Sequence, residues 1–141
     1  MTDGCPFCEI GAGNADQDLI VLRTERVFVV PSLKQRLSSP GQVIVCPIEH
    51  VTALHAVDAS VLAEVFGVVT RLTSAAPMAF GALGTTVLNN NDAPDQVLRH
   101  LHVHVIPRWA GDGFVIPNPD DTPAPRELRA RLAAQLQRAL T

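Results

Sequence analysis

Three hydrophobic runs near the start of the chain predict β-strands. Residues 19–24 (LIVLRT) and 27–31 (VFVVP) are rich in β-branched side chains, and two charged residues separate them, which predicts a hairpin. Residues 43–47 (VIVCP) are apolar throughout, as expected of a buried strand. The intervening residues 33–41 contain serine, proline and glycine, so we expect a loop there.

The hydrophobic pattern then changes to the period of a helix. Apolar residues recur at steps of three and four at Val61, Val65, Val68 and Leu72. We expect Asp58 or Ser60 to cap the N-terminus of this helix and Pro77 to end it. Residues 126–140 repeat leucine at every fourth position and predict a second helix, whose leucines pack against the rest of the protein.

Two further strands flank a turn-rich segment. Residues 85–89 (TTVLN) and 101–107 (LHVHVIP) have strand patterns, and the sequence between them begins with NNNDAPD. Residues 110–125 carry four prolines and are expected to be extended. Three strands, a helix and two more strands, joined by short links, predict an α+β fold in which one main helix packs on an antiparallel sheet.

Composition narrows the class of protein. The chain has 141 residues, enough for one domain, and its 47% hydrophobic and 18% charged residues exclude a disordered chain. A net charge of −3 without a basic run argues against a nucleic acid polymer as partner. No apolar run approaches the roughly 20 residues of a membrane span, and the N-terminus does not resemble a signal peptide. We therefore expect a cytoplasmic protein with no membrane partner.

Three histidines alternate with aliphatic residues at His100, His102 and His104, so a strand would project all three to one face. This pattern fits an ordinary half-exposed strand, a metal site or nucleophilic catalysis at phosphorus. Side chains at this spacing on a strand lie ~6–7 Å apart, whereas the ligand atoms of one metal ion must lie within ~3.5 Å of each other. Binding of one ion by all three histidines would therefore be strained, although two of them could converge. A neutral imidazole is a good nucleophile near pH 7, and its neighbours can orient it and protonate a leaving group.

Two of the three cysteines form Cys5-Pro6-Phe7-Cys8. The pair fits a redox site, two free thiols or half of a structural zinc site. A redox pair follows a strand, for which the preceding residues leave no room, and a zinc site needs two more nitrogen or sulfur ligands. Cys46 lies in a predicted buried strand and is expected to be part of the core.

Four segments, in order, resemble the histidine triad (HIT) family of nucleotide hydrolases and transferases. HLHVHVI (100–106) matches the family's signature of three alternating histidines. SSPGQVIVCPIEHV (38–51) is similar to its Pro-Gly-His segment, and LNNNDAPDQVLRHLHVHVIPR (88–108) to its Asn-rich loop, triad and Ile-Pro-Arg. CPFCEI (5–10) is similar to the opening of zinc-containing members.

The resemblance implies the family's five-stranded antiparallel sheet with helices, assembled as a homodimer. It places this domain at residues 1–113 and a Pro-rich extension with a C-terminal helix at 114–141. It also implies a structural zinc ion, and the residues that match the zinc ligands of relatives are Cys5, Cys8, His50 and His100.

By the same resemblance, His102 attacks the α-phosphorus of a nucleotide and becomes transiently nucleotidylated. His104 contacts the phosphate and helps the leaving group depart, and Asn89 lies near the scissile phosphate. The residues expected to contact the nucleotide and its phosphate are Ser32, Gln42, Asn89, Gln96, Val97, His102 and His104.

Three departures from the family pattern bear on activity. Gln42 stands where the family has a further active-site histidine, and an amide cannot shuttle a proton near pH 7. Asp95 and Val97 flank the loop glutamine where Gly and Ser or Thr are common. The expected ribose-binding acid is not evident, and Ser32 is the nearest candidate.

The resemblance thus implies a nucleotide hydrolase or nucleotidyltransferase that acts on a nucleotide phosphoramidate or a (di)nucleoside polyphosphate. Its partner would be a purine nucleotide or a nucleotide conjugate. The departures leave an alternative open, namely a nucleotide-binding or regulatory protein with little or no turnover.

Overall fold

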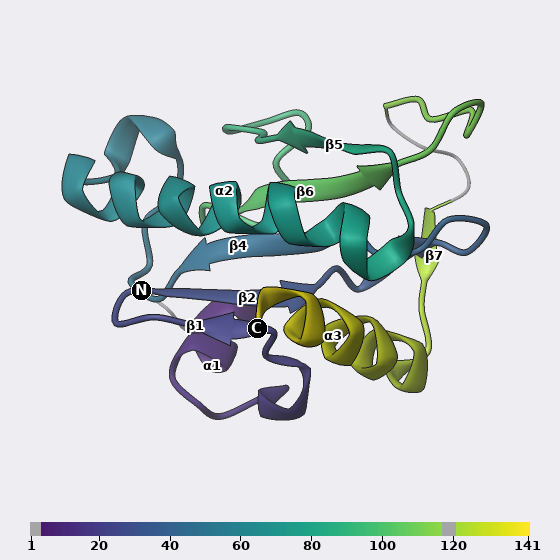
Figure 1. Ribbon diagram of the computed structural model, residues 1–141. Helices are drawn as coiled ribbons and strands as arrows, with labels where there is room; N and C mark the ends of the chain where they lie inside the picture. The colour runs from purple at the N-terminus through teal and green to yellow at the C-terminus, as the bar shows by residue number, and fades with distance from the viewer. Residues whose placement is uncertain (1–3, 117–120) are drawn as a thin grey trace.

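Figure 1 shows the computed structural model, which describes residues 4–116 and 121–141. Its elements, in chain order, are α1 (Pro6–Gly11), the 3-10 helix η1 (Gln17–Leu19), β1 (Leu22–Arg23), β2 (Val27–Pro31), β3 (Lys34–Arg36), β4 (Val43–Pro47), the 3-10 helix η2 (Leu54–Ala56), α2 (Ala59–Phe80), β5 (Gly84–Leu88), β6 (Val103–Arg108), β7 (Asp121–Pro123) and α3 (Arg126–Leu140).

Five strands form one antiparallel sheet in the order β1-β2-β4-β6-β5, and β3 pairs with β7 in a small second sheet. The predicted α+β fold with a five-stranded antiparallel sheet is therefore confirmed. The runs at 27–31 and 43–47 form β2 and β4 with the predicted bounds. Both strands are buried on both faces, which is why they are apolar throughout.

The helix α2 lies across one face of the sheet, and α3 runs beside it (Figure 1). As predicted, Asp58 caps α2, since its carboxylate accepts a hydrogen bond from the Ser60 N–H at 2.8 Å. The predicted apolar face of α2 is buried against β2, β4 and β6. Ala133 and Leu136 of α3 are buried in the same cluster, so the C-terminal helix shares the main core.

The prediction that Pro77 ends this helix was wrong, because α2 continues to Phe80. A proline removes one N–H donor from a helix but keeps its carbonyl oxygen. Here that oxygen accepts hydrogen bonds from the N–H groups of Gly81 and Ala82. Gly81 adopts φ +67°, a left-handed conformation that glycine takes without strain, and it ends the helix.

By length and composition α2 is apolar enough to cross a membrane, so the expectation that no segment approaches this limit was wrong. The core helix of a water-soluble fold can meet the same criterion, and Val65 and Leu72 of α2 are fully buried against the sheet. The apolar character of α2 is therefore explained by packing.

Two predicted strands are shorter than expected. Only Leu22–Arg23 of the run 19–24 pairs with β2, because Leu19 belongs to η1 and is buried on the other side of the sheet. The triad strand begins at Val103 instead of residue 101, since the Leu101 N–H donates to the carbonyl of Val51 at 2.8 Å. The first two triad histidines therefore precede β6.

Besides the two 3-10 helices, three elements were not predicted. The expected loop at 33–41 contains β3, and the expected extended stretch at 110–125 contains β7. Pro117 and Pro119 of that stretch lie outside the described residues. The short helix α1 begins immediately after Cys5, whose sulfur accepts a hydrogen bond from the Cys8 N–H.

Candidate functional site

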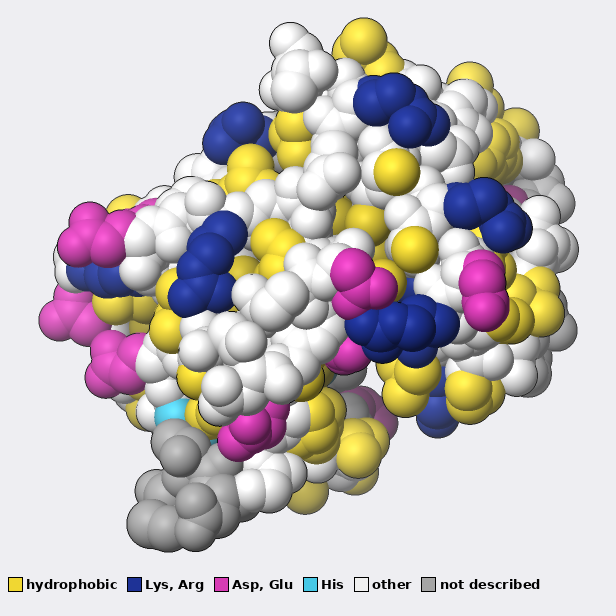
Figure 2. All heavy atoms as spheres, turned by 90° about the horizontal axis from the view of Figure 1, so that it is seen from below, with side chains coloured by type: hydrophobic (Ala, Val, Ile, Leu, Met, Phe, Trp, Pro, Cys, Tyr) yellow, Lys and Arg dark blue, Asp and Glu magenta, His cyan; other side chains and the backbone are white. Residues whose placement is uncertain are grey.

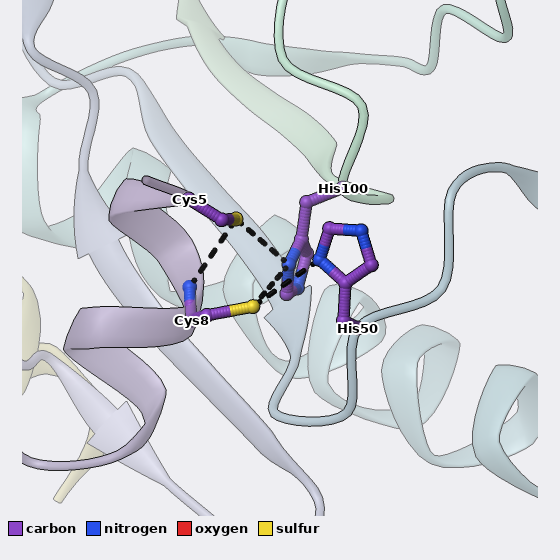
Figure 3. A group of neighbouring side chains, drawn as sticks. All are labelled: Cys5, Cys8, His50 and His100. Atoms are coloured by element: carbon purple, nitrogen blue, oxygen red, sulfur yellow. Dashed lines mark hydrogen bonds between the residues drawn. The ribbon is translucent and has the colours of Figure 1, made fainter. Parts of the chain in front are cut away.

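Four side chains from three segments form a compact cluster beside α1 (Figure 3). Cys5 and Cys8 come from the start of α1, His50 from the loop after β4, and His100 from the segment before β6. The Cys5 Sγ lies 3.4 Å from the His100 Nδ1, and the Cys8 Sγ lies 3.2 Å from the His50 Nδ1 and 3.5 Å from the His100 Nδ1. The structure thus brings together all four residues that the resemblance implied.

The geometry of this cluster fits a zinc ion. Zinc bonds of about 2.3 Å to sulfur and 2.0–2.1 Å to nitrogen, in a tetrahedron, place the ligand atoms about 3.3–3.8 Å apart. The three sulfur–nitrogen distances lie close to this range, and all four ligand atoms fall within 4.8 Å of one another. Two cysteines and two histidines are also a common donor set of structural zinc sites.

The hydrogen bonds and the burial of the cluster residues favour the binding of a cation. The Nε2 of His100 lies 2.8 Å from the carbonyl oxygen of Pro47, which fixes Nδ1 as the free lone pair facing the cysteines. Burial first, and the Cys5 side chain second, raise the pKa of the Cys8 thiol to about 11. Burial lowers the pKa of His100 to about 4, which keeps the ring neutral. A thiolate pair at this place therefore needs a positive ion to compensate its charge.

A cavity of about 680 Å³ lies next to the cluster, on the face of the sheet opposite α2. Its floor follows from the strand register, because directly opposed residues share a face. Leu88 of β5 pairs with His104 of β6, His104 with Ile44 of β4, and Ile44 with Val30 of β2. All four line the cavity. In this row the imidazole of His104 therefore lies between aliphatic side chains, with Leu88 on one side and Ile44 and Val30 on the other.

His102 enters the same cavity beside His104, and the two ring centres lie 5.0 Å apart. The Nδ1 of His102 lies 2.8 Å from the carbonyl oxygen of His100, and a carbonyl can only accept a hydrogen bond. Nδ1 therefore carries the proton and Nε2 carries the lone pair. Burial lowers the pKa of His102, which keeps the ring neutral and nucleophilic near pH 7.

An apolar wall of the cavity adjoins the histidines. Phe7 and Ile10 of α1, together with Leu19 of η1, line it next to Val30 and are buried in one hydrophobic cluster. The Phe7 ring also packs edge-on against His102, with centres 5.1 Å apart. Sequence patterning missed Phe7, although its place between the two cysteines fixes it beside the cysteine–histidine cluster. The wall suits a flat apolar group such as a nucleobase.

Side-chain amides hold the loop before the triad through hydrogen bonds to the backbone. The Nδ2 of Asn89 donates to the carbonyl oxygen of His102 at 2.9 Å. Gln96 is buried and joins the Asp92 N–H to the carbonyl of Thr52, at 2.6 Å each. Asn89 and Gln96 thus fasten the backbone around the site and do not themselves line the cavity. Val97 is 88% exposed and lies outside the cavity lining.

Ser32 and Gln42 form the next row along the floor, at the far end of β2. Both line the cavity, and the Ser32 N–H donates to the carbonyl oxygen of Gln42 at 3.0 Å. The Gln42 Nε2 turns to the carbonyl oxygen of Lys34 at 3.3 Å. The Ser32 hydroxyl is buried and has no hydrogen-bond partner among the described residues. Asp95 also lines the cavity, from the loop before the triad.

Gln35 holds this end of the site together and was not expected from the sequence. Its side chain is fully buried, and its Nε2 donates to the carbonyl oxygens of Ser32 and Gln42 at 2.9 and 2.8 Å. Its Oε1 accepts hydrogen bonds from the N–H groups of Gly41 and Gln42 at 3.0 and 3.1 Å. A single glutamine in a loop carries no pattern that could have revealed this role.

The side of the molecule that carries α1 and α3, at the bottom of Figure 1, has charges of both signs. Figure 2 shows this face, where Lys and Arg side chains are interspersed with Asp and Glu side chains. On the part of this face that the structure describes, no continuous basic patch is present. Such a surface is not of the kind that binds a nucleic acid backbone.

Comparison with known proteins identifies the family. A family model described as "HIT domain" matches residues 14–111, which include the sheet, α2 and the triad. "Protein hit" of Bacillus subtilis is 30% identical over 114 residues, which cover 79% of this chain and 77% of that protein. "AP-4-A phosphorylase" of Mycobacterium tuberculosis is 31% identical over 125 residues, and the match covers 79% of this chain but only 57% of that protein.

Solved structures agree over almost the whole chain. A Zn-bound histidine triad family protein from Mycobacterium smegmatis superposes with a TM-score of 0.84 at 25% identity, covering 99% of this chain and 95% of that one. A Hit-like protein from Bartonella henselae, described as involved in cell-cycle regulation, superposes with a TM-score of 0.86 at 26% identity, covering 97% and 96%. The sequence motifs, the sheet and these matches together show that the chain belongs to the histidine triad (HIT) family.

Proposed function

We propose that this protein is a nucleotide hydrolase or nucleotidyltransferase that acts at the α-phosphorus of a nucleotide phosphoramidate or a (di)nucleoside polyphosphate. The observation that carries the proposal is the 2.8 Å hydrogen bond between the His102 Nδ1 and the carbonyl of His100. It leaves the Nε2 lone pair free at the wall of a cavity large enough for a nucleotide.

The reaction would proceed in two steps. The His102 Nε2 attacks the α-phosphorus, a P–N bond forms, and the bond from phosphorus to the leaving group breaks. Water or another acceptor then attacks the same phosphorus and breaks the P–N bond, which returns His102 to its neutral form. The acceptor determines whether the enzyme is a hydrolase, a phosphorylase or another transferase.

His104 and Asn89 would support these steps. Burial, with the neighbouring His102 as a smaller cause, lowers the pKa of His104 to about 4, so its neutral ring can donate one N–H to a phosphate oxygen or to the leaving group. Its Nδ1 is buried without a partner among the described residues, which leaves it available to a ligand. Asn89 would act by holding the His102 backbone in place.

The remaining expected contacts follow from the cavity. The base would lie against the apolar wall, with the phosphate at the histidines, and Ser32 and Gln42 would face the ribose and phosphate. Gln96 and Val97 would act through the shape and backbone of their loop. Cys5, Cys8, His50 and His100 would hold zinc, whose role is structural because four protein ligands leave no open position.

A second candidate function is nucleotide binding with little or no turnover. Asp95 favours it, because a carboxylate that lines the cavity opposes a bound phosphate. Gln42 favours it as well, because an amide cannot shuttle a proton near pH 7. The preferred partner under either function is a purine nucleotide or a nucleotide conjugate, and we place the protein in the cytoplasm.

A turnover panel tests the proposal. Adenosine 5′-phosphoramidate and dinucleoside polyphosphates, with and without inorganic phosphate as acceptor, are incubated with the protein, and nucleotide release is measured. We expect release by the wild type and none by His102→Ala. The matched control is His55→Ala, because His55 is an exposed histidine paired with Asp92. Nucleotide binding without release across the panel would favour the second function, and full activity of His102→Ala would refute the nucleophile.

A further inference from the structure

The cavity continues beyond the floor that the nucleotide would occupy. Past Ser32 it is lined by Lys34 of β3 and by Arg129 of α3. Neither residue belongs to the five-stranded sheet, and Arg129 lies after the segment that matches the HIT family model. This end of the cavity is therefore built by β3 and α3, outside the five-stranded sheet.

A chain of backbone contacts holds Arg129 next to Ser32. The Arg129 Nε donates to the carbonyl oxygen of Ala124 at 3.3 Å, and the Ala124 N–H donates to the carbonyl oxygen of Leu33 at 2.9 Å. Leu33 directly follows Ser32, and Lys34 opens β3, which pairs with β7. These contacts fix the direction of the guanidinium at the junction of β2 and β3.

Both cations are free to bind a ligand. Within residues 4–116 and 121–141, no acceptor is recorded for the Nη groups of Arg129, and no acidic partner is recorded for the Lys34 Nζ. The hydroxyl of Ser32, which is 6% exposed, also has no hydrogen-bond partner among these residues. Three donor groups around one end of a cavity thus have unused hydrogen-bonding capacity.

The carboxylates that line the cavity leave this end positive. Asp16 is already paired, since its Oδ1 accepts a hydrogen bond from Arg126 at 2.8 Å. Asp121 lies opposite Arg36 in the β3–β7 ladder. Asp95 belongs to the loop before the triad, a different segment from those that carry Lys34, Ser32 and Arg129.

We propose that Lys34, Arg129 and Ser32 form a second anion subsite, which binds a phosphate carried on the 2′ or 3′ oxygen of the nucleotide's ribose. The inference rests on the proposed function. A nucleotide with its 5′ phosphate at His102 and its base against the apolar wall places its ribose over the Ile44–Val30 part of the floor, beside Ser32. A guanidinium and an ammonium next to a ribose hydroxyl distinguish a phosphorylated ribose from a free one.

Binding measurements with matched nucleotides test this subsite. Adenosine 2′,5′-bisphosphate, adenosine 3′,5′-bisphosphate and AMP are titrated by calorimetry into the wild type and into Lys34→Gln, Arg129→Gln and the double variant. Arg131→Gln is the matched control, because Arg131 lies on the same helix, is exposed and does not line the cavity. Two charge-assisted contacts predict that one of the bisphosphates binds the wild type about 10- to 100-fold more tightly than AMP. This preference is lost in the double variant and kept in Arg131→Gln.

A chemical readout is available as well, because Lys34 is the only lysine in the sequence. Acetylation of the peptide that contains Lys34, followed by mass spectrometry, should be slowed by the preferred bisphosphate and not by AMP with added inorganic phosphate. Equal affinity for AMP and both bisphosphates would overturn the second subsite and leave the proposed function intact. Failure of all three nucleotides to bind would overturn both.

Discussion

Ser32 and His104 each hold a buried polar atom with no hydrogen-bond partner among the described residues. Burying such an atom unpaired costs free energy, so native structures rarely keep one without a reason. Both atoms belong to residues that line the nucleotide-sized cavity. A bound nucleotide would supply the missing partners. Ser32 and His104 therefore each have an unpaired polar atom in the free protein, and we expect both atoms to form hydrogen bonds when a nucleotide binds.

Replacing Ser32 by alanine should have opposite effects on stability and on binding. The variant removes an unpaired buried hydroxyl, so the free energy of unfolding should stay unchanged or rise slightly. The same change removes a contact to the ribose, so nucleotide affinity should fall by about 1 kcal/mol, or roughly fivefold. Thermal melts with and without AMP measure both effects. Lower stability combined with unchanged AMP affinity would show that the hydroxyl serves the fold alone.

The four residues of the cysteine–histidine cluster were found from sequence only because of the family resemblance. The Cys5–Cys8 pair carried the chemical signal by itself, but no spacing rule connects it to His50, 42 residues after Cys8. The neutral tautomer of His102 could not be predicted either, because it depends on where the His100 carbonyl points once the triad strand starts late.

At the level of elements, strands with uniform burial were predicted best. β2 and β4 are buried on both faces, so their apolar runs mark their bounds. The elements that complete the site lack such a signal. β3 and β7 are short, polar and paired with each other across a large separation in sequence, and α1 depends on its Cys5 cap. The prediction that Pro77 ends α2 was wrong because a proline in the last turns of a helix removes one N–H donor without ending the helix.

A zinc ion would tie α1, the loop after β4 and the segment before β6 into one unit. We expect elemental analysis of protein purified without chelator to find one zinc ion per chain. Cys8→Ser should lose the metal and melt at a lower temperature, by roughly 4 °C for each kcal/mol of stability lost. Cys46→Ala is the control, because Cys46 is a buried core cysteine outside the cluster and its variant should keep zinc. A metal-free wild type would contradict the assignment.

Gln35 should be essential for the loop that joins β2 to β4. Gln35→Leu removes four hydrogen bonds to backbone groups, and of these groups the Gln42 carbonyl keeps its second donor, the Ser32 N–H. The variant should lose about 3 kcal/mol of stability or more, measured by urea unfolding. The control is Gln137→Leu, which removes one exposed hydrogen bond to the carbonyl of Ile20. A loss in Gln35→Leu no larger than in this control would show that the loop is held by other contacts.

On the scale of the whole molecule, β5 is one of the two edge strands of the five-stranded sheet. β5 ends the strand order, and Leu83, just before it, is 78% exposed, while Met78 of α2 is 76% exposed. An open strand edge next to exposed apolar side chains favours pairing with a second chain. These features support the homodimer that we propose for this protein.

Multi-angle light scattering tests that assembly. We expect the wild type to have twice the 15.1 kDa mass of one chain, and Leu83→Glu to shift it towards a single chain, because a buried unpaired charge is costly at an interface. Leu37→Glu is the matched control, since Leu37 is an exposed leucine directly after β3 and lies outside the five-stranded sheet. A wild type with the mass of one chain would refute the dimer.

The central claim is that His102 carries the nucleotide during turnover. The most direct measurement is rapid acid-free quenching of the wild type with adenosine 5′-phosphoramidate, followed by mass spectrometry of the intact chain and of its peptides. We predict an added adenylyl group on the peptide that contains residues 100–104, assigned to His102 by fragmentation and missing from His102→Ala. Turnover by the wild type with no adduct on His102, or with the adduct on another residue, would contradict the mechanism.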